Sequence, residues 1–528
     1  MIRTTPHRLR EYRAERVLRR HAGVAAAVVV ALGAALRIRS AHGTFLAPDE
    51  SIVLSIASAP SLGATWDAGI TNLYPPLGYA LLRAWLLPAR GDLWVRLFPI
   101  VFFAAGLAVA WRTARALAGS SRALAALTLL SLSPSLVPWT TEVRPYSLLF
   151  FLSAAALEAL RRATGPIPDG RAPAALAFGA FAGLAVGAHY SAVLFLGGLL
   201  PWALARAVAH RLPRGILARL AGSWSVPVVI SGLSLAGHLS RTLSTGVSGD
   251  LRRRLYPEGH FRPGEEGPLS FLARQTWHLF VEVASSRFVA ALLVTALIAA
   301  LVTASRRTRP SLLLFLGPLA AGSVTALLGF YPIGGYRQST WLLLPLALGV
   351  ALGLRPVVLR FRVPVAMLAL LGGGAAFAFV PAAAPSGKPR EAQMRSDLDA
   401  ALASLDRPGS APQALLMDLS TSVVFAWYRG APGADYWVPD GRELHLTRIG
   451  AHVVRISDVW FHGEDSLRKA VEAARRESPP VPGRLGVFAI SPERSLVRFV
   501  ETATPGRGAG HRQWFGPNIV TGAIAAEE

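Results

Sequence analysis

The sequence lacks the residue patterns that identify several large enzyme classes. It contains no cysteine among 528 residues, which excludes a disulfide framework, a thiol nucleophile and a Cys-ligated metal. It also has no Gly-rich phosphate-binding loop, no H-E-x-x-H and no G-x-S-x-G, so nucleotide hydrolysis, zinc proteolysis and serine hydrolysis have no supporting motif. We therefore predict no metal site and no cofactor, since a divalent cation has no residue pattern in its favour.

Charged residues are scarce as well. They make up 16% of the chain, against about 25% in ordinary soluble proteins, while hydrophobic residues make up 52%. Residues 383–528 contain 17 basic and 17 acidic side chains, so the whole net charge of +23 lies in residues 1–382. Such a distribution is typical of the orientation signals of a membrane protein, whereas a nucleic-acid surface would be expected on the soluble part. We expect a lipid bilayer as a partner and no nucleic acid.

The apolar residues form runs long enough to cross a membrane. A helix needs about 20 residues to span roughly 30 Å of hydrocarbon. The runs predict an α-helical polytopic membrane domain over residues 1–382, with about eleven transmembrane helices. Segments 48–59 and 75–88 follow proline and have apolar residues at helical spacing, so we expect amphipathic helices at the membrane interface. The eleven runs lie at 22–36, 97–115, 122–138, 145–160, 173–188, 190–206, 218–237, 287–304, 311–330, 339–355 and 363–381.

The arginines order these runs across the membrane. If the N-terminus is cytoplasmic and the runs alternate, every cytoplasmic connection is rich in arginine, as the positive-inside rule requires. The same alternation places five polar stretches on the outer side and predicts a functional site at that face. These stretches are Asp49-Glu50, residues 139–146, His189-Tyr190, residues 238–286 and residues 331–338.

The composition changes at residue 383 to that of a soluble protein. Residues 383–528 are broken by proline and glycine and contain two short apolar runs typical of strands, A-L-L-M-D at 414–418 and L-G-V-F-A-I at 485–490. We predict a small α/β domain here, on the extracytoplasmic side of the membrane.

The first acidic pair, Asp49-Glu50, follows Pro48 directly. One interpretation is that both carboxylates only cap the start of a helix, where they accept hydrogen bonds from unpaired N–H groups. The other is that they act as catalytic groups. The two roles are compatible, because a capped helix start is a rigid place to hold a base.

The other outer-side residues have two interpretations each. Glu142 and Arg144 form a local ion pair, or Arg144 binds a phosphate through its planar guanidinium. Tyr336 and Arg337 anchor the chain at the interface, or Arg337 is a second phosphate ligand, since the positive-inside rule does not ask for an arginine there. His189 and Tyr190 cap a span, or they line a substrate cavity.

Taken in order, these motifs resemble the GT-C membrane glycosyltransferases, in particular the family 39-like group of protein mannosyltransferases and the aminoarabinose transferase of lipid A. The resemblance is carried by the acidic pair, Y-P-P-L-G-Y-A-L-L-R-A-W at 74–85, V-R-L-F-P-I at 95–100, S-P-S-L-V-P-W-T-T-E-V-R-P-Y-S-L-L at 133–149 and A-H-Y at 188–190. It covers roughly residues 20–200 well and Y-P-I-G-G-Y-R more loosely.

The resemblance implies a GT-C fold and a sugar donor linked to polyprenyl phosphate, with transfer to an extracytoplasmic glycan, lipid or protein. It implies that Asp49, with Glu50 beside it, acts on the acceptor. It also implies that Glu142 and Tyr146 lie near the substrate cavity with Arg144. We expect Tyr74 and Tyr336 to line the same cavity. Tyr74 stands where many members have His before Pro-Pro, and Thr141 where Gln is common, which removes support for metal binding near residues 75–88.

A carboxylate opposite a phosphate leaving group favours direct displacement with inversion at the anomeric carbon. The rival interpretation is a transporter or flippase of lipid-linked cell-envelope intermediates. Transporters more often carry ionisable groups near the midplane and show internal repeats, whereas here the charges gather at one face and no repeat is visible. The sequence therefore favours the enzyme.

Overall fold

The computed structural model of the protein divides into two compact units. The first comprises Met1–Ala41, Arg96–Thr242 and Gly246–Ala383, and the second comprises His42–Val95, Leu243–Thr245 and Ala384–Glu528. The residues that the structure describes are 6–42, 44, 46–71, 74–167, 170–245, 257–303, 309–353, 388–406, 414–430, 444–449, 452–457, 485–490, 513–515 and 519–524.

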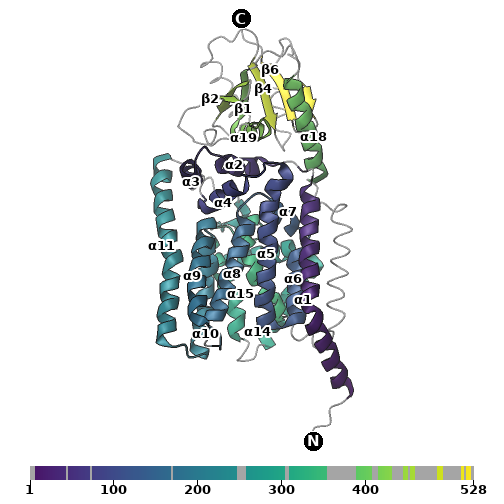
Figure 1. Ribbon diagram of the computed structural model, residues 1–528, viewed down its shortest axis with the longest axis vertical. Coiled ribbons are helices and arrows are strands. Elements are labelled where there is room, and N and C mark those ends of the chain that lie inside the picture. Colours follow the sequence, from purple (N-terminus) through teal and green to yellow (C-terminus); the bar gives the residue numbers. More distant parts are fainter. Residues whose placement is uncertain are drawn as a thin grey trace. The chain divides into compact units, whose positions relative to one another are not determined.

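The first unit is a bundle of helices (Figure 1). Its closest helix pairs are α8 with α9 and α10 with α15, and one continuous apolar core runs through it. Its elements are α1 (Pro6–Ala41), α5 (Asp92–Ala118, whose first turn belongs to the second unit), α6 (Ser120–Leu132), α7 (Leu136–Thr141), α8 (Tyr146–Ala163), α9 (Arg171–Ala188), α10 (Ala192–Ala209), α11 (Arg214–Thr245), η1 (Pro257–Gly259), α13 (Pro268–Ala284), α14 (Arg287–Thr303), α15 (Arg309–Leu327), η2 (Arg337–Leu342) and α16 (Leu343–Gly353).

Six helices among the described residues are long and apolar enough to span a membrane, so the protein is a multi-pass membrane protein. A pair bent by 115°, α13 with the first part of α14, passes the same test as one broken span. The six are His21–Ala41, Asp92–Ala118, Arg171–Ala188, Ala192–Ala209, Arg214–Ser234 and Pro310–Leu327.

The predicted number of eleven spans stays a prediction. The run 122–138 is not one helix, because Pro134 follows the end of α6 and α7 starts only at Leu136. The run 339–355 is divided between η2 and α16. The run 363–381 lies outside the described residues.

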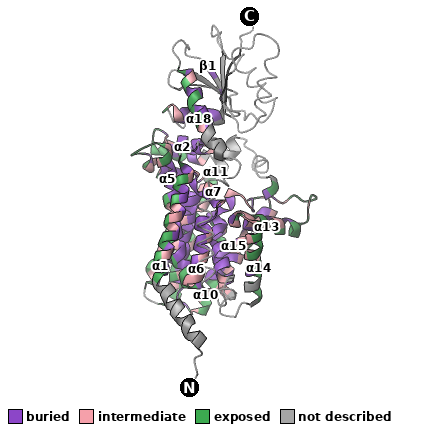
Figure 2. Ribbon diagram, turned by 90° about the vertical axis from the view of Figure 1, so that its right-hand side faces the viewer, coloured by how far each residue is buried: buried purple, intermediate pink, exposed green. Residues whose placement is uncertain are grey.

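The outer surface of the bundle is suited to lipid. Figure 2 shows buried residues in its interior and exposed residues along the outer sides of α1, α10 and α14. Many of the exposed side chains are large and apolar, including Val28, Val208 and Leu292. Inside the bundle, α10 and α15 touch backbone to backbone, because a Cβ added at Gly198 would collide with Pro318 and one at Gly317 with the carbonyl of Gly198. Such small-residue contacts are typical of membrane helix pairs.

The second unit combines three short helices with an α/β part. Helices α2 (Pro48–Ala57), α3 (Leu62–Thr71) and α4 (Leu77–Trp85) pack on one another. Two of them fall within the predicted segments 48–59 and 75–88, and the helical prediction is confirmed there, whereas α3 was not predicted. Helices α18 (Lys388–Leu405) and α19 (Leu419–Tyr428) accompany the sheet (Figure 1).

The sheet has six strands in the order β2-β3-β1-β4-β6-β5, with a parallel centre and antiparallel edges. Both strands predicted from the sequence, 414–418 and 485–490, are confirmed as β1 and β4, and they are neighbours. The six strands are β1 (Ala414–Asp418), β2 (Leu444–Ile449), β3 (His452–Ser457), β4 (Leu485–Ile490), β5 (Gln513–Phe515) and β6 (Ile519–Ile524).

The predicted domains, 1–382 and 383–528, stay a prediction. The second unit contains residues 42–95 as well as the chain from Ala384 onward. Residues 42–95 group with the C-terminal part because α2 packs directly on α19. A second connection is the hydrogen bond of 3.1 Å from the backbone N–H of Leu46 to the hydroxyl of Tyr428. The segment that carries the acidic pair is thus held by the C-terminal part of the chain.

Candidate active site

The predicted site residues fall into two sets. Asp49, Glu50 and Tyr74 belong to the second unit. The others belong to the first unit and come from three places: the turn between α7 and α8, the turn between α9 and α10, and the start of η2. They are Glu142, Arg144, Tyr146, His189, Tyr190, Tyr336 and Arg337.

In the second unit, the two carboxylates have different environments. Pro48 is the first residue of α2, and the Glu50 carboxylate Oε2 accepts the backbone N–H of Ala47 at 3.0 Å. This is the return contact of a capping box, and Glu50 is only 2% exposed. Asp49 is partly exposed in the same first turn. The geometry therefore gives Glu50 a structural contact and leaves Asp49 with access to a second molecule.

The surroundings of α2 fix its position. Arg83 of α4 donates to the carbonyls of Ala59 and, at 3.2 Å, Pro60, just past the end of α2. A cation at this end is favoured because the last carbonyls of a helix have no partner within it. Tyr74 precedes the Pro75-Pro76 pair that leads into α4 and is half-buried.

A polar cluster holds the segment before α2. The hydroxyl of Tyr428 accepts the N–H of Leu46 and donates to Asp92 Oδ2 at 3.3 Å. Arg395 of α18 makes an ion pair with Asp92 and lies 4.3 Å from the centre of the Tyr428 ring. Burial and the Asp92 charge raise the pKa of Tyr428, so its hydroxyl stays protonated. This cluster could not be predicted from the sequence, because its contacts join Leu46 and Asp92 to residues more than 300 positions later.

In the first unit, an ion pair joins two distant segments. Arg337 Nη1 donates to Glu142 Oε2 at 3.0 Å, with both side chains about one quarter exposed. Glu142 ends α7 in an extended conformation, and Arg337 begins η2, which packs against α8, α10 and α16. Glu142 is thus paired with Arg337, 195 residues away.

Arg144 lies deeper, at 8% exposure, and its backbone N–H donates to the carbonyl of Glu142 at 2.7 Å. Its charge acts on His189, where burial first and Arg144 second lower the pKa to about 3. The backbone N–H of Ser191 donates to His189 Nδ1 at 3.1 Å, so this nitrogen is an acceptor and the imidazole is neutral. The ring of Tyr146 lies 5.4 Å from the His189 ring, centre to centre.

Arg37 supports this turn and was missed as a site-related residue. It is 1% exposed in α1 and donates from Nε to the hydroxyl of Thr140 at 2.6 Å and from Nη1 to the carbonyl of Ser131 at 2.6 Å. These bonds fix the end of α6 and the last turn of α7, directly before Glu142. A charged side chain within a membrane span has a high energetic cost unless it is hydrogen-bonded. The position of Arg37 within the span His21–Ala41 could therefore have identified it.

The remaining two residues lie at the edges of this group. Tyr336 faces η1 and α13, where burial and the charge of Glu258 raise its pKa and Arg274 lowers it. Tyr190 follows His189, is half-buried, and accepts the N–H of Val193 at its carbonyl, which starts α10. Within the described residues, no three His, Asp or Glu side chains lie together as metal ligands would.

The site of the first unit is therefore cationic. Two guanidinium groups, one buried and one half-buried, accompany one carboxylate and one neutral imidazole. Buried arginine favours an anionic ligand, and its fork of donors matches the oxygens of a phosphate.

Comparison with known proteins identifies the families and folds that the chain is similar to. Residues 74–232 match the sequence family of dolichyl-phosphate-mannose-protein mannosyltransferases. No curated protein sequence matches the chain. The crystal structure of ArnT from Cupriavidus metallidurans bound to undecaprenyl phosphate has a TM-score of 0.56 at 13% identity, covering 94% of this chain and 97% of that chain. The oligosaccharyltransferase AglB from Archaeoglobus fulgidus, in complex with an inhibitory peptide and a dolichol-phosphate, has a TM-score of 0.43 at 13% identity, covering 79% and 64%.

The resemblance stated from the sequence is confirmed. The chain is similar to the GT-C membrane glycosyltransferases, in sequence over residues 74–232 and in fold over nearly its whole length.

Proposed function

We propose that this protein is a membrane glycosyltransferase that moves a sugar from a polyprenyl-phosphate donor to an extracytoplasmic glycan, lipid or protein. The observation that carries the proposal is the turn between α7 and α8, where buried Arg144 stands two residues from the Glu142–Arg337 pair. ArnT, whose fold the chain shares, was crystallised with undecaprenyl phosphate, which is the class of lipid expected here.

The proposed reaction breaks the bond between the anomeric carbon and the phosphate oxygen and forms a bond from that carbon to the acceptor oxygen. The phosphate leaves with the bonding electrons, and Arg144 and Arg337 stabilise the charge that develops on it. Asp49 takes the proton of the acceptor hydroxyl. Attack opposite the leaving group inverts the anomeric configuration, and the donor itself supplies the energy.

The remaining residues have supporting roles. Glu142 orients Arg337, because a carboxylate bound to one edge of a guanidinium group fixes the direction in which its other N–H donors point. Neutral His189 adds no positive charge to Arg144, and with Tyr146 it contributes a wall of rings against which a sugar packs. Glu50 holds the first turn of α2.

The direct test measures sugar transfer by the purified full-length protein in nanodiscs. Lipid that co-purifies with the protein is identified by mass spectrometry, and the same sugar on a polyprenyl phosphate is supplied with an envelope extract as acceptor. We expect sugar to leave the lipid phosphate and appear on an acceptor with inverted configuration. A flippase would instead move the intact lipid-linked sugar between leaflets, and movement without bond cleavage would overturn the proposal.

The orientation is tested separately. We propose that the N-terminus is cytoplasmic and residues 383–528 extracytoplasmic, because the connections then placed inside are rich in arginine. A periplasm-active reporter fused after residue 390 is expected to be active, and one fused at residue 308 inactive, with a cytoplasm-active reporter giving the reverse pattern. The opposite pattern at both positions would contradict the placement of the site.

A further inference from the structure

A second cavity lies at the other end of α8 from the candidate active site. It has a volume of about 750 Å³ and is lined by α5, α8, α9 and the connection between α8 and α9. Glu158, one of its lining residues, follows Tyr146 by twelve residues, which is about 18 Å along an α-helix. The charged end of the cavity therefore lies apart from the α7–α8 turn, toward the other end of α8.

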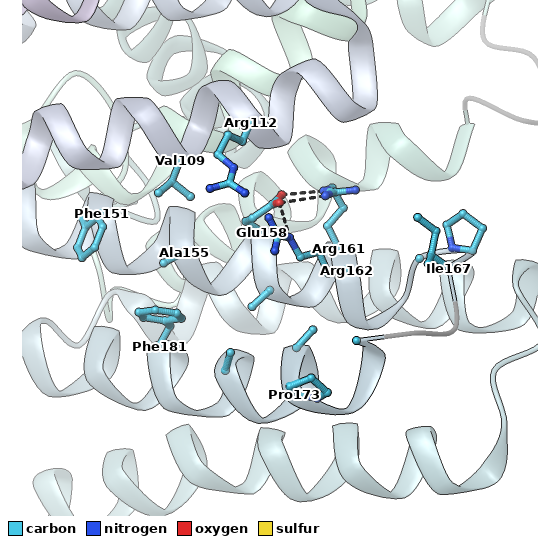
Figure 3. Close-up of a pocket in the computed structure, with 16 residues that line it drawn as sticks. Val109, Arg112, Phe151, Ala155, Glu158, Arg161, Arg162, Ile167, Pro173 and Phe181 are labelled. Carbon is cyan, nitrogen blue, oxygen red and sulfur yellow. Dashed lines mark hydrogen bonds and ion pairs between the residues drawn. The ribbon is translucent and has the colours of Figure 1, made fainter. Parts of the chain in front are cut away.

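One end of this cavity is charged. Glu158 accepts two hydrogen bonds from Arg161, from Nε at 2.7 Å and Nη2 at 2.9 Å, and one from Arg162 Nε at 2.8 Å. The hydroxyl of Thr113 donates a fourth at 3.0 Å. Arg112 of α5 reaches the same space from the other side (Figure 3) and has no hydrogen bond or ion pair within the described part of the chain. Three guanidinium groups thus surround one carboxylate, which leaves two positive charges in excess.

The other end of the cavity is apolar. Phe151 and Phe181 stand together there, away from the arginines (Figure 3), and Val109 and Ala177 complete the wall. Ile167, on the far side of the arginines from these rings (Figure 3), also lines the cavity and is 69% exposed. A ligand that fills this space must therefore carry a negative group at one end and hydrocarbon at the other.

We propose that this cavity binds an anionic phospholipid of the surrounding bilayer, with its phosphate among Arg112, Arg161 and Arg162 and part of one acyl chain against Phe151 and Phe181. Free phosphate would leave the apolar wall exposed to water, and a neutral lipid would leave the excess positive charge uncompensated. The membrane face at which the arginines gather is also the face where anionic lipid headgroups attract basic side chains. The inference does not depend on the proposed sugar transfer, but it rests on the proposed orientation of the chain in the membrane.

The test uses the full-length protein in mild detergent and native mass spectrometry with added lipids. Phosphatidylglycerol is expected to remain bound to the parent chain about tenfold more than phosphatidylcholine at equal concentration. Arg112→Gln combined with Arg162→Gln should lose most of this preference. The matched control, Arg115→Gln with Arg219→Gln, removes two exposed arginines that do not line the cavity and should keep it.

Three results would overturn the proposal: equal loss in both double variants, equal binding of the two lipids, or displacement of phosphatidylglycerol by inorganic phosphate or by an equimolar polyprenyl phosphate. A second measurement needs no variant. Phosphatidylglycerol with a photoreactive acyl chain should label peptides containing Phe151 or Phe181 in the parent protein, and labelling confined to other helices would contradict the site. Ala177→Phe, which fills the apolar wall and keeps every charge, should abolish that labelling.

Discussion

Replacing Asp49 with Asn is expected to slow sugar transfer by about 100-fold or more while the protein remains folded. Asn has nearly the same shape and can still accept hydrogen bonds at a helix start, but it cannot take a proton from an acceptor hydroxyl. Donor binding should be largely kept, because the proposed phosphate ligands are Arg144 and Arg337. The measurements are the turnover of a polyprenyl-phosphate sugar by the purified variant and its melting temperature.

Glu50 supplies the matched control. Its carboxylate accepts the N–H of Ala47, and a Gln amide oxygen can do the same, so Glu50→Gln should retain most activity. Glu50→Ala removes the contact and should cost about 0.5–2 kcal/mol of stability. If Asp49 were only a capping residue, Asp49→Asn would be as active as the parent, and that result would exclude it as the base.

The contrast between these two neighbours could be predicted only in part. Pro48 and the following acids indicate a helix start from the sequence, and a helix does start there. The sequence does not determine which acid turns back to cap it. In the structure Glu50 caps the helix start and is buried, whereas Asp49 is partly exposed.

Contacts between residues far apart in the sequence were harder to predict than this helix start. The turn 142–146 was recognised as a candidate from its residue types, but the partner of Glu142 lies at Arg337, and a single sequence holds no signal for a contact across 195 positions. The same holds for Asp92 with Arg395, which ties residues 42–95 to the C-terminal part. Local periodicity and composition predicted most helices and two strands. They could not predict that residues 42–95 group with the C-terminal part, because distant contacts join the two segments.

Replacing Arg337 with Lys is expected to lower kcat/KM for the donor by about 10- to 100-fold, the value of one or two charged hydrogen bonds. Lysine keeps the charge but loses the planar fork that holds Glu142 and a phosphate at the same time. The protein should still fold, because a half-exposed ion pair contributes only about 0–1 kcal/mol. Arg144→Lys should have an effect of at least the same size on donor use, since Arg144 is more deeply buried.

Variants of Glu142 test whether Arg337 binds the donor phosphate or has only a structural role. If Arg337 serves only to pair with Glu142, then Glu142→Gln, Arg337→Lys and the double variant should all lose the same activity. If Arg337 contacts the donor phosphate, Arg337→Lys should raise the donor KM far more than Glu142→Gln, and the loss should persist in the Glu142→Gln background. Arg115→Lys changes an exposed residue in the last turn of α5 and controls for the general effect of replacing an arginine with lysine. Equal donor KM values for Arg337→Lys and Arg115→Lys, with melting temperatures unchanged, would remove Arg337 from the donor site.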